Sequence, residues 1–237
     1  MEEIIPGTLY IVSTPIGNLS DITFRAVHIL NSVDIIAAED TRVTSVLLRH
    51  YDIKKKMLAY HSYNQSHQTG HLIQLLKENK SIAMVSDAGT PGISDPAYAL
   101  VRAAADNDIH IVPIPGASAL LAALIVSGLP CNRFSFEGFL PKKKGRKTKI
   151  EILASESRTI VFYESPHRIL RTVKELYASW GDRKCVMGRE ITKKFEEFFR
   201  GSLSDLLLRL EQKKAKGEIV LIIEGYGGEP KTKPKVA

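Results

Sequence analysis

The 237-residue sequence is poor in cysteine and contains no long apolar run. Its two cysteines, Cys131 and Cys185, lie far apart without a CxxC spacing, so neither a disulfide framework nor a zinc site is indicated. No apolar run approaches the roughly 20 residues of a membrane span. The chain begins Met1-Glu2-Glu3, without the basic and apolar regions of a signal peptide. We therefore expect a cytoplasmic protein without a membrane segment.

Common cofactor and metal motifs are missing as well. No loop matches GxGxxG followed by a suitably spaced acid, and GxxxxGK[ST] does not occur, which argues against a nicotinamide cofactor or a nucleoside triphosphate. His67 and His71 have the spacing of one helix face, but no Glu follows His67 in an HExxH pattern. Their polar neighbours are typical of a surface or an RNA-facing edge. We expect no bound metal.

The composition indicates a globular and basic protein. Hydrophobic residues make up 44% of the chain and charged residues 25%, enough for one large core or two modest ones. A net charge of +7 attracts polyanions if the excess is clustered. Much of it lies in the basic run 141–149, which contains Lys142, Lys143, Lys144, Arg146, Lys147 and Lys149. This basic run fits a phosphate contact and, equally, a solvated loop.

Apolar strand-like runs alternate with helix-like segments in the first half of the chain. This pattern predicts an α/β domain over residues 1–115, with parallel strands joined by helices. Continuous apolar runs such as 9–12 and 82–85 are typical of a sheet that is covered on both faces. The expected strands are 8–12, 34–37, 82–85 and 109–114, and the expected helices are 24–30, 44–50 and 97–105.

A second α/β domain is expected over residues 116–226. The prolines and glycine of 113–116 indicate a hinge before it. Its sheet should be mixed, with strands at 134–139, 159–163, 185–188, 195–200 and 219–224 and helices at 148–154, 166–180 and 203–214. The remaining residues, 227–237, have little to bury and are predicted to form a disordered basic tail.

Three loops follow apolar runs and are rich in Gly, Pro and hydroxyl residues. They span 13–19, 86–96 and 115–119. In open α/β sheets ligands bind outside the carboxyl ends of the strands, and such loops bring backbone amides and carbonyls close to a ligand. Each loop alone also fits a tight strand-to-helix turn. Three of them together favour a binding site.

Five segments carry a specific resemblance to a known family. They are LYIVSTPIGNL at 9–19, AAEDTR at 37–42, VSDAGTPGISDP at 85–96, FYESPHR at 162–168 and GREITK at 188–193. From about Gly7 to Gly225 the chain resembles the tetrapyrrole methylase superfamily. The resemblance implies two α/β domains with S-adenosylmethionine in the cleft between them. Within the superfamily the chain is similar to members that methylate a cytidine 2′-oxygen in small-subunit (16S) ribosomal RNA.

The resemblance also implies site residues and a homodimer. Cofactor contacts transfer to both domains, at Pro15, Ile16, Gly89, Thr90, Ile93, Ser118, Ala119, Tyr163, Glu190 and Ile219. Relatives that act on tetrapyrroles carry Gly-Asp-Pro where this chain has Gly89-Thr90-Pro91. Thr90 must therefore act as a neutral substitute for that carboxylate.

Methyl transfer to a ribose hydroxyl needs a group that orients the hydroxyl and accepts its proton. Glu39 and Asp40 follow an apolar strand and are the first candidates, with Asp87 a lesser one. The same Glu-Asp-Thr-Arg sequence is also typical of a helix start. RNA contacts are expected at basic residues, namely Arg42, Lys142, Lys143, Lys144, Arg146, Lys147, Arg168 and Arg189. Arg42 and Arg189 could instead pair with neighbouring acids, and Arg168 could instead be an exposed helix residue.

Two other functions remain open at this point. One is methylation of a tetrapyrrole or another small molecule, and the other is a non-catalytic role as an RNA-binding ribosome-assembly protein. The basic run favours RNA over a small acceptor, since RNA needs a positively charged rim. The three intact loops argue against the non-catalytic role.

Overall fold

The computed structural model describes residues 3–227. The chain divides into two compact units, with the boundary between Ala119 and Leu120. Helix α5 (Ala119–Ile125) begins at this boundary. Residues 228–237, most of the segment interpreted as a disordered basic tail, lie outside the described residues.

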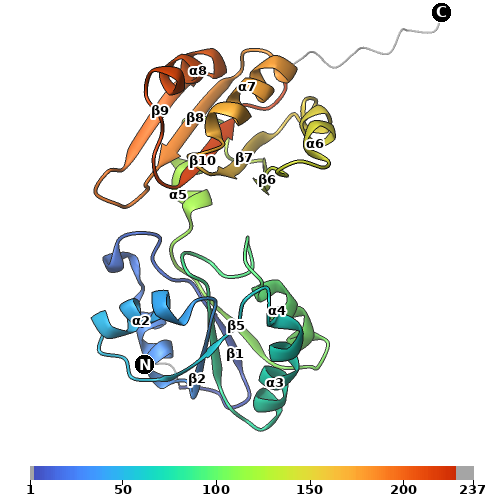
Figure 1. Cartoon of the computed structure of the whole chain (residues 1–237). Helices are drawn as coiled ribbons and strands as arrows, with labels where there is room; N and C mark the ends of the chain where they lie inside the picture. The colour runs from blue at the N-terminus through green and yellow to red at the C-terminus, as the bar shows by residue number, and fades with distance from the viewer. Residues whose placement is uncertain (1–2, 228–237) are drawn as a thin grey trace, which may run out of the picture. The chain divides into compact units, whose positions relative to one another are not determined.

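The first unit is a five-stranded sheet flanked by helices (Figure 1). Its strands lie in the order β3-β2-β4-β1-β5. Every neighbouring pair is parallel, as the sequence predicted. The strands are β1 (Leu9–Val12), β2 (Ile35–Ala38), β3 (Lys56–Ala59), β4 (Ile82–Val85) and β5 (Ile111–Ile114). The helices are η1 (Leu19–Asp21), α1 (Phe24–Ser32), α2 (Thr41–His50), α3 (Gln65–Lys77) and α4 (Ala97–Ala105).

Helices cover both faces of this sheet. Tyr10 and Val12 of β1 belong to a core that includes residues of α1 and α2. Leu9 belongs to a separate core with residues of α3 and α4. Successive side chains of a strand point to opposite faces, so strands covered on both sides must be apolar throughout. Helices on both faces of the sheet therefore explain the continuous apolar runs, as the sequence predicted.

The second unit is a mixed sheet in the order β6-β7-β10-β8-β9. Strand β6 is parallel to β7, and the other neighbouring pairs are antiparallel. The strands are β6 (Phe134–Phe139), β7 (Thr159–Glu164), β8 (Lys184–Arg189), β9 (Glu197–Ser202) and β10 (Ile219–Ile223). The helices are α6 (Arg146–Leu153), α7 (Ile169–Trp180) and α8 (Leu203–Gln212). The prediction of two α/β domains is confirmed.

One core holds the second unit together. Side chains from α6, α7 and α8 pack on alternate residues of β10, including Ile219 and Leu221. Helix α8 starts with a capping box, in which Ser202 and Asp205 exchange side-chain to backbone hydrogen bonds. The sequence predicted this start.

Some elements differ from the prediction. Strand β3 and helix α3 were not expected, because β3 is a short edge strand beginning at a lysine and α3 begins with polar residues. Helix α7 begins at Ile169 rather than at Pro166, since the amides of Arg168 and Ile169 both donate to the Ser165 carbonyl and form a turn first. No helix within residues 3–227 has the length and apolar character needed to cross a membrane.

Candidate active site

Four loops of the first unit share one edge of its sheet, because β1, β2, β4 and β5 are parallel. They begin at Ser13, Glu39, Ser86 and Pro115. This edge, called here the carboxyl edge, contains all three glycine- and proline-rich loops that the sequence singled out. Parallel strands bring their carboxyl ends together, and ligands of such sheets bind there.

Direct hydrogen bonds join the three loops. Thr14 and Gly89 exchange backbone hydrogen bonds of 2.9 and 3.1 Å. The Ser13 hydroxyl donates to the Thr90 hydroxyl oxygen at 3.0 Å, and the Thr90 hydroxyl donates to the Ala117 carbonyl at 3.2 Å. Thr90 therefore links the loop after β1 to the loop after β5.

Two glycines are required by the close approach of these loops. A Cβ on Gly116 would lie 2.9 Å from the Ser13 Cβ, a distance that real side chains do not adopt. Gly89 has a φ of +77°, and its Cβ would lie 3.2 Å from the Ile16 side chain. Two of the predicted cofactor residues in these loops differ in exposure: Ile16 is buried, whereas Ile93 is 48% exposed.

Three carboxylates stand on the same edge. The Glu39 Oε2 accepts a hydrogen bond from the Asp87 amide at 3.2 Å, and the Asp87 Oδ1 accepts one from the Asp40 amide at 2.9 Å. The Glu39 Oε1 receives no hydrogen bond from any residue in 3–227. Asp40 caps α2, accepting from the Arg42 amide at 2.8 Å, and pairs with the Arg42 guanidinium at 2.6 Å. The helix-start interpretation thus holds for Asp40.

These carboxylates have different proton affinities. Burial raises the pKa of Glu39, and the neighbouring carboxylates of Asp87, Asp95 and Asp40 raise it further against the opposing Asp87 amide. Burial raises the pKa of Asp87 as well. Hydrogen bonds from Arg42 hold the pKa of Asp40 at about 2. A carboxylate with a higher pKa is the stronger base, so Glu39 and Asp87 are better proton acceptors than Asp40.

Three predicted cofactor residues lie at one end of the second sheet. Tyr163 of β7 pairs with Val220 of β10, and Ile219 pairs with Arg189 of β8, directly before Glu190. Ile219 is only 3% exposed and its side chain belongs to the core. It could therefore offer a ligand its backbone but little of its side chain.

Tyr163 and Glu190 are each engaged within the second unit. The Tyr163 ring meets Phe136 and Phe139 edge-on, at centroid distances of 4.9 and 5.8 Å, and burial raises its pKa. The Glu190 carboxylate accepts from the Glu218 amide at 3.0 Å. A Cβ on Gly217 would lie 2.3 Å from this carboxylate group, so the glycine is needed for the contact.

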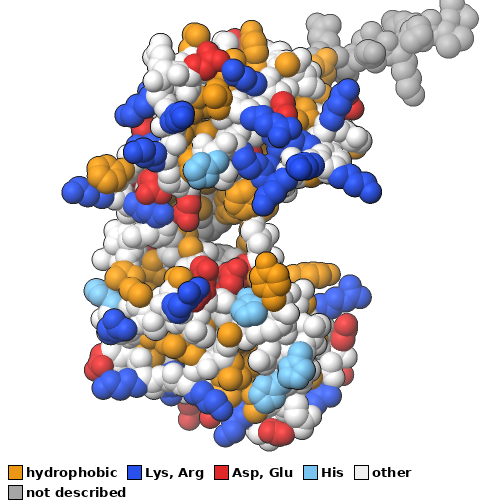
Figure 2. Space-filling view, viewed as in Figure 1, with side chains coloured by type: hydrophobic (Ala, Val, Ile, Leu, Met, Phe, Trp, Pro, Cys, Tyr) orange, Lys and Arg blue, Asp and Glu red, His pale blue; other side chains and the backbone are white. Residues whose placement is uncertain are grey.

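The basic run contains exposed lysines and one buried arginine. Lys142, Lys143, Lys144 and Lys147 are exposed on the segment that leads from β6 into α6. Figure 2 shows Lys and Arg side chains gathered over this part of the second unit. Arg146, by contrast, is 3% exposed. Its guanidinium bonds Glu175 at 2.6 Å and the Thr172 hydroxyl at 2.7 Å, so the predicted RNA contact does not hold for Arg146.

Two further arginines are held inside the second unit. Arg168 pairs with Glu164 at 3.4 Å and donates to the Leu140 carbonyl. Arg189 pairs with Glu197 at 2.6 Å. Their side chains are 22% and 18% exposed. The pairing that the sequence left open is observed at Arg189, whereas Arg168 is not the exposed helix residue that the sequence allowed. Arg42 also pairs with an acid, but its side chain is 89% exposed.

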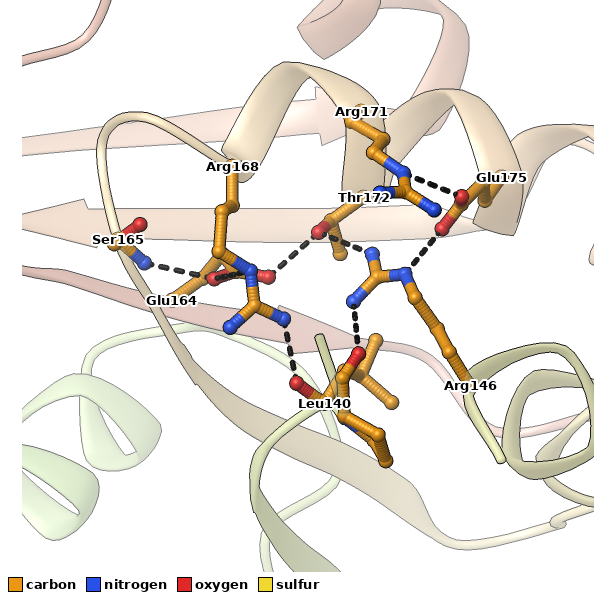
Figure 3. A network of polar contacts seen from close by, with 9 residues as sticks. Leu140, Arg146, Glu164, Ser165, Arg168, Arg171, Thr172 and Glu175 are labelled. Carbon is orange, nitrogen blue, oxygen red and sulfur yellow. Dashed lines mark hydrogen bonds and ion pairs between the residues drawn. The ribbon is translucent and has the colours of Figure 1, made fainter. Parts of the chain in front are cut away.

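Sequence reasoning missed the part played by Glu164. This carboxylate is 1% exposed and accepts from the Ser165 amide at 2.8 Å and from the Thr172 hydroxyl at 2.6 Å (Figure 3). Through Arg168 and Arg146 the network reaches the carbonyls of Leu140 and Pro141, directly before the exposed lysines. The signal was a carboxylate at the end of an apolar strand, the same signal that identified Glu39.

Histidine and acidic side chains of the described residues do not assemble into a metal site. Within residues 3–227 no group of three or more His, Cys, Asp or Glu side chains could hold a metal ion. The three predicted general-base candidates are joined through Asp87, whose amide donates to Glu39 and whose carboxylate accepts from the Asp40 amide.

Comparison with curated proteins finds close relatives over most of the chain. Ribosomal RNA small subunit methyltransferase I of Streptococcus pyogenes serotype M3 is 51% identical over 220 residues, covering 92% of this chain and 77% of that protein. The protein of the same name from Halalkalibacterium halodurans is 49% identical, covering 93% and 77%. The one from Escherichia coli O157:H7 is 45% identical, covering 96% and 81%.

Solved structures with low sequence identity share the fold. A cobalt precorrin-4 methyltransferase of cobalamin biosynthesis matches with a TM-score of 0.66 at 18% identity, covering 92% of this chain and 95% of its own. Diphthine synthase matches with a TM-score of 0.67 at 15% identity, covering 92% and 90%. The family model described as Tetrapyrrole (Corrin/Porphyrin) Methylases matches residues 8–207. The chain therefore belongs to the tetrapyrrole methylase family and is an S-adenosylmethionine-dependent methyltransferase.

Proposed function

We propose that this enzyme methylates the ribose 2′-hydroxyl of a cytidine in small-subunit (16S) ribosomal RNA. The observation that carries the proposal is the carboxyl edge of the first unit, where three hydrogen-bonded loops meet the Glu39–Asp87 pair. The names of the 45–51% identical relatives support an acceptor in ribosomal RNA. The exposed lysines of the basic run support a polyanionic substrate.

The carboxyl edge fits S-adenosylmethionine chemically. Its loops offer backbone groups, the Thr90 hydroxyl and the neighbouring Ser118, all suited to a polar ligand. Gly92 has a φ of +88° and nothing within 4 Å of its Cβ position, so the loop is open there. S-adenosylmethionine supplies a methyl group already activated by a positively charged sulfonium. The grouped carboxylates of Glu39, Asp40 and Asp87 suit that positive charge.

We assign proton acceptance to Glu39. Its Oε2 is fixed by the Asp87 amide, which leaves Oε1 for the substrate hydroxyl. Its raised pKa makes it a stronger base than Asp40, whose pKa is about 2. Asp87 acts in this scheme as the residue that positions Glu39, through its backbone amide. Asp40 remains engaged with Arg42.

RNA contacts are assigned to the exposed cations Lys142, Lys143, Lys144, Lys147 and Arg42. The remaining predicted site residues keep the roles that the family resemblance implies, with Pro15, Ile16, Gly89, Ile93, Ala119, Tyr163, Glu190 and Ile219 as cofactor contacts. A homodimer and a cytoplasmic location also stay predictions. A small tetrapyrrole acceptor is less well supported, since the cobalt precorrin-4 methyltransferase is only 18% identical to this chain.

Methyl transfer from labelled S-adenosylmethionine tests the proposal. The full-length protein is incubated with isolated small ribosomal subunits, with naked 16S RNA and with a mixture of porphyrinogens. Label is expected in RNA, and nuclease digestion should release it as 2′-O-methylcytidine. Label in the porphyrinogens alone, or on a base of the RNA, would contradict the proposal.

A further inference from the structure

A cavity of about 610 Å³ opens in the second unit, away from the residues discussed above. It is lined by residues at the starts of β6, β7 and β8 and at the end of β10, among them Thr159 and Glu224. Tyr163 lies near the opposite end of β7 from Thr159. All lining residues lie between Pro130 and Gly227, so the cavity belongs to the second unit alone.

Three arginines line this cavity, each directly before a strand: Arg133, Arg158 and Arg183. Arg133 is exposed and forms no ion pair with any residue of 3–227. Arg158 binds Glu156 through Nε and Nη2. Asp182 and Glu224 also line the wall. The Asp182 carboxylate already accepts hydrogen bonds from the Ser204 amide at 2.9 Å and the Ser204 hydroxyl at 2.7 Å.

Arg183 is a cation without an ion-pair partner among residues 3–227. Its guanidinium lies 5.0 Å from the Trp180 ring centroid and 5.5 Å from that of Tyr226. Nη2 donates to the Ala154 carbonyl, whereas the buried Nη1 has no acceptor among residues 3–227. Burial lowers the pKa of this side chain, which means that its charge is poorly solvated. A negative partner would relieve this cost.

The cavity also offers an aromatic surface. Tyr226 is 50% exposed, and Trp180 lines the wall behind Arg183. A single phosphate would fill only a small part of this volume, which is in the range of cavities that bind whole small molecules. A phosphate joined to a flat ring would use both the arginines and the tyrosine, since nucleic-acid bases stack on aromatic side chains. Glu224 could accept hydrogen bonds from sugar hydroxyls.

We propose that this cavity binds a nucleoside monophosphate, either free or as one nucleotide of an RNA chain, with its phosphate on Arg133 and Arg183 and its base on Tyr226. The site is independent of the proposed methyl transfer, because it shares no residue with the carboxyl edge. Its occupancy would give the second unit a recognition function of its own.

Tryptophan fluorescence provides the test, because Trp180 is the chain's single tryptophan and lines the cavity. The full chain is titrated with cytidine and adenosine monophosphates, with the matching nucleosides and with inorganic phosphate. We expect saturable emission changes with the monophosphates, at concentrations at least about tenfold below those needed for nucleoside or phosphate alone. No saturable change with either monophosphate would overturn the proposal.

Two variants and one control make the test specific. Arg133→Glu and Tyr226→Ala should each weaken monophosphate binding about tenfold or more, whereas Lys54→Glu, an exposed cation of the first unit, should not. Equal affinity in wild type, Arg133→Glu and Tyr226→Ala would overturn the proposal. An RNA oligonucleotide that displaces the monophosphate identifies RNA as the source, and one that fails to displace it identifies the free nucleotide.

Discussion

The carboxylate of Glu39 accepts a hydrogen bond of 3.2 Å from the backbone amide of Asp87. The two residues follow different strands, β2 and β4, which lie side by side in the sheet. The Asp87 carboxylate in turn accepts a hydrogen bond from the backbone amide of Asp40, the residue that follows Glu39. Two adjacent loops thereby fix the orientation of one carboxylate whose pKa is raised by burial. This arrangement is suited to a positioned general base.

Glu39→Gln should lower kcat by about 10²- to 10⁴-fold, the usual contribution of a general base. The amide keeps a similar size and can still accept from the Asp87 amide, so the affinity for S-adenosylmethionine should stay within about threefold. Single-turnover methyl transfer and calorimetric titration measure the two quantities. Asp40→Asn serves as the control and should retain most of the activity. Full activity in Glu39→Gln would remove this residue from the mechanism.

The activity should depend on pH through Glu39. Its pKa lies above the ordinary 4.5, and proton acceptance requires the ionised form, so the rate should rise as pH increases through the raised pKa. The corresponding acidic limb should be missing from the residual activity of Glu39→Gln. If the acidic limb of the pH profile persisted unchanged in Glu39→Gln, a group other than Glu39 would cause it.

The raised pKa of Glu39 also predicts how its contribution to the folding stability changes with pH. The folded state binds this proton more tightly than the unfolded chain, so the stabilisation is present below pH 4.5 and is lost as pH rises through the folded pKa. At neutral pH Glu39→Gln should therefore unfold at the same or a higher denaturant concentration than the wild type. A clear loss of stability at pH 7 would show that the ionised carboxylate is structurally required.

Thr90→Leu should abolish cofactor binding without unfolding the protein. The Thr90 hydroxyl links Ser13 to the Ala117 carbonyl, and a larger apolar side chain would separate the loops and enter the proposed site. Thr90→Ser keeps the hydroxyl and should bind normally. Calorimetric titration with S-adenosylmethionine measures both variants, and circular dichroism checks the fold. Normal cofactor affinity in Thr90→Leu would mean that the cofactor binds elsewhere.

Charge reversal of Lys142, Lys143 and Lys144 should weaken RNA binding while leaving cofactor affinity intact. If each lysine neutralises a phosphate, the slope of the logarithm of affinity against that of salt concentration should fall by about three. The Lys54–Lys56 run in the first unit offers a control with the same change in net charge. Filter binding at several salt concentrations distinguishes the two triple variants. An equal loss of RNA affinity in the two triple variants would mean that the basic run acts only through its net charge.

Arg146→Ala should destabilise the second unit rather than act on RNA directly. Its buried guanidinium bonds the Thr172 hydroxyl and Glu175, whose side chain is 32% exposed, so its removal should cost about 2 kcal/mol of unfolding free energy. Lys147→Ala, next along the chain and exposed, should stay within about 0.5 kcal/mol of the wild type. Urea denaturation measures both variants. Equal stabilities would mean that the Arg146 contacts contribute little.

The sequence predicted the features that depend on local pattern. Apolar runs located most of the strands, and the residues directly after them located the carboxyl edge, because parallel strands must end together. Glu39 and Asp87 were both found in this way, although they are 48 residues apart in the chain. The helix expected over 203–214 likewise begins where α8 does, at Leu203.

Features that depend on distant partners were not predictable. Arg146 and Lys144 are similar in sequence context, yet only Arg146 turns inward, since Thr172 and Glu175 of α7 provide acceptors for its guanidinium. Likewise, the sequence does not show that the Thr172 hydroxyl of α7 will bond the buried Glu164 carboxylate and accept from Arg146. These contacts arise from packing α6 and α7 on the sheet.

Mass-spectrometric mapping of 16S ribosomal RNA, from cells with and without the gene, tests the central claim most directly. We expect one 2′-O-methylcytidine to be present with the gene, absent without it and restored by the wild-type protein but not by Glu39→Gln. Identical modification maps from the two cell types would contradict the proposed activity.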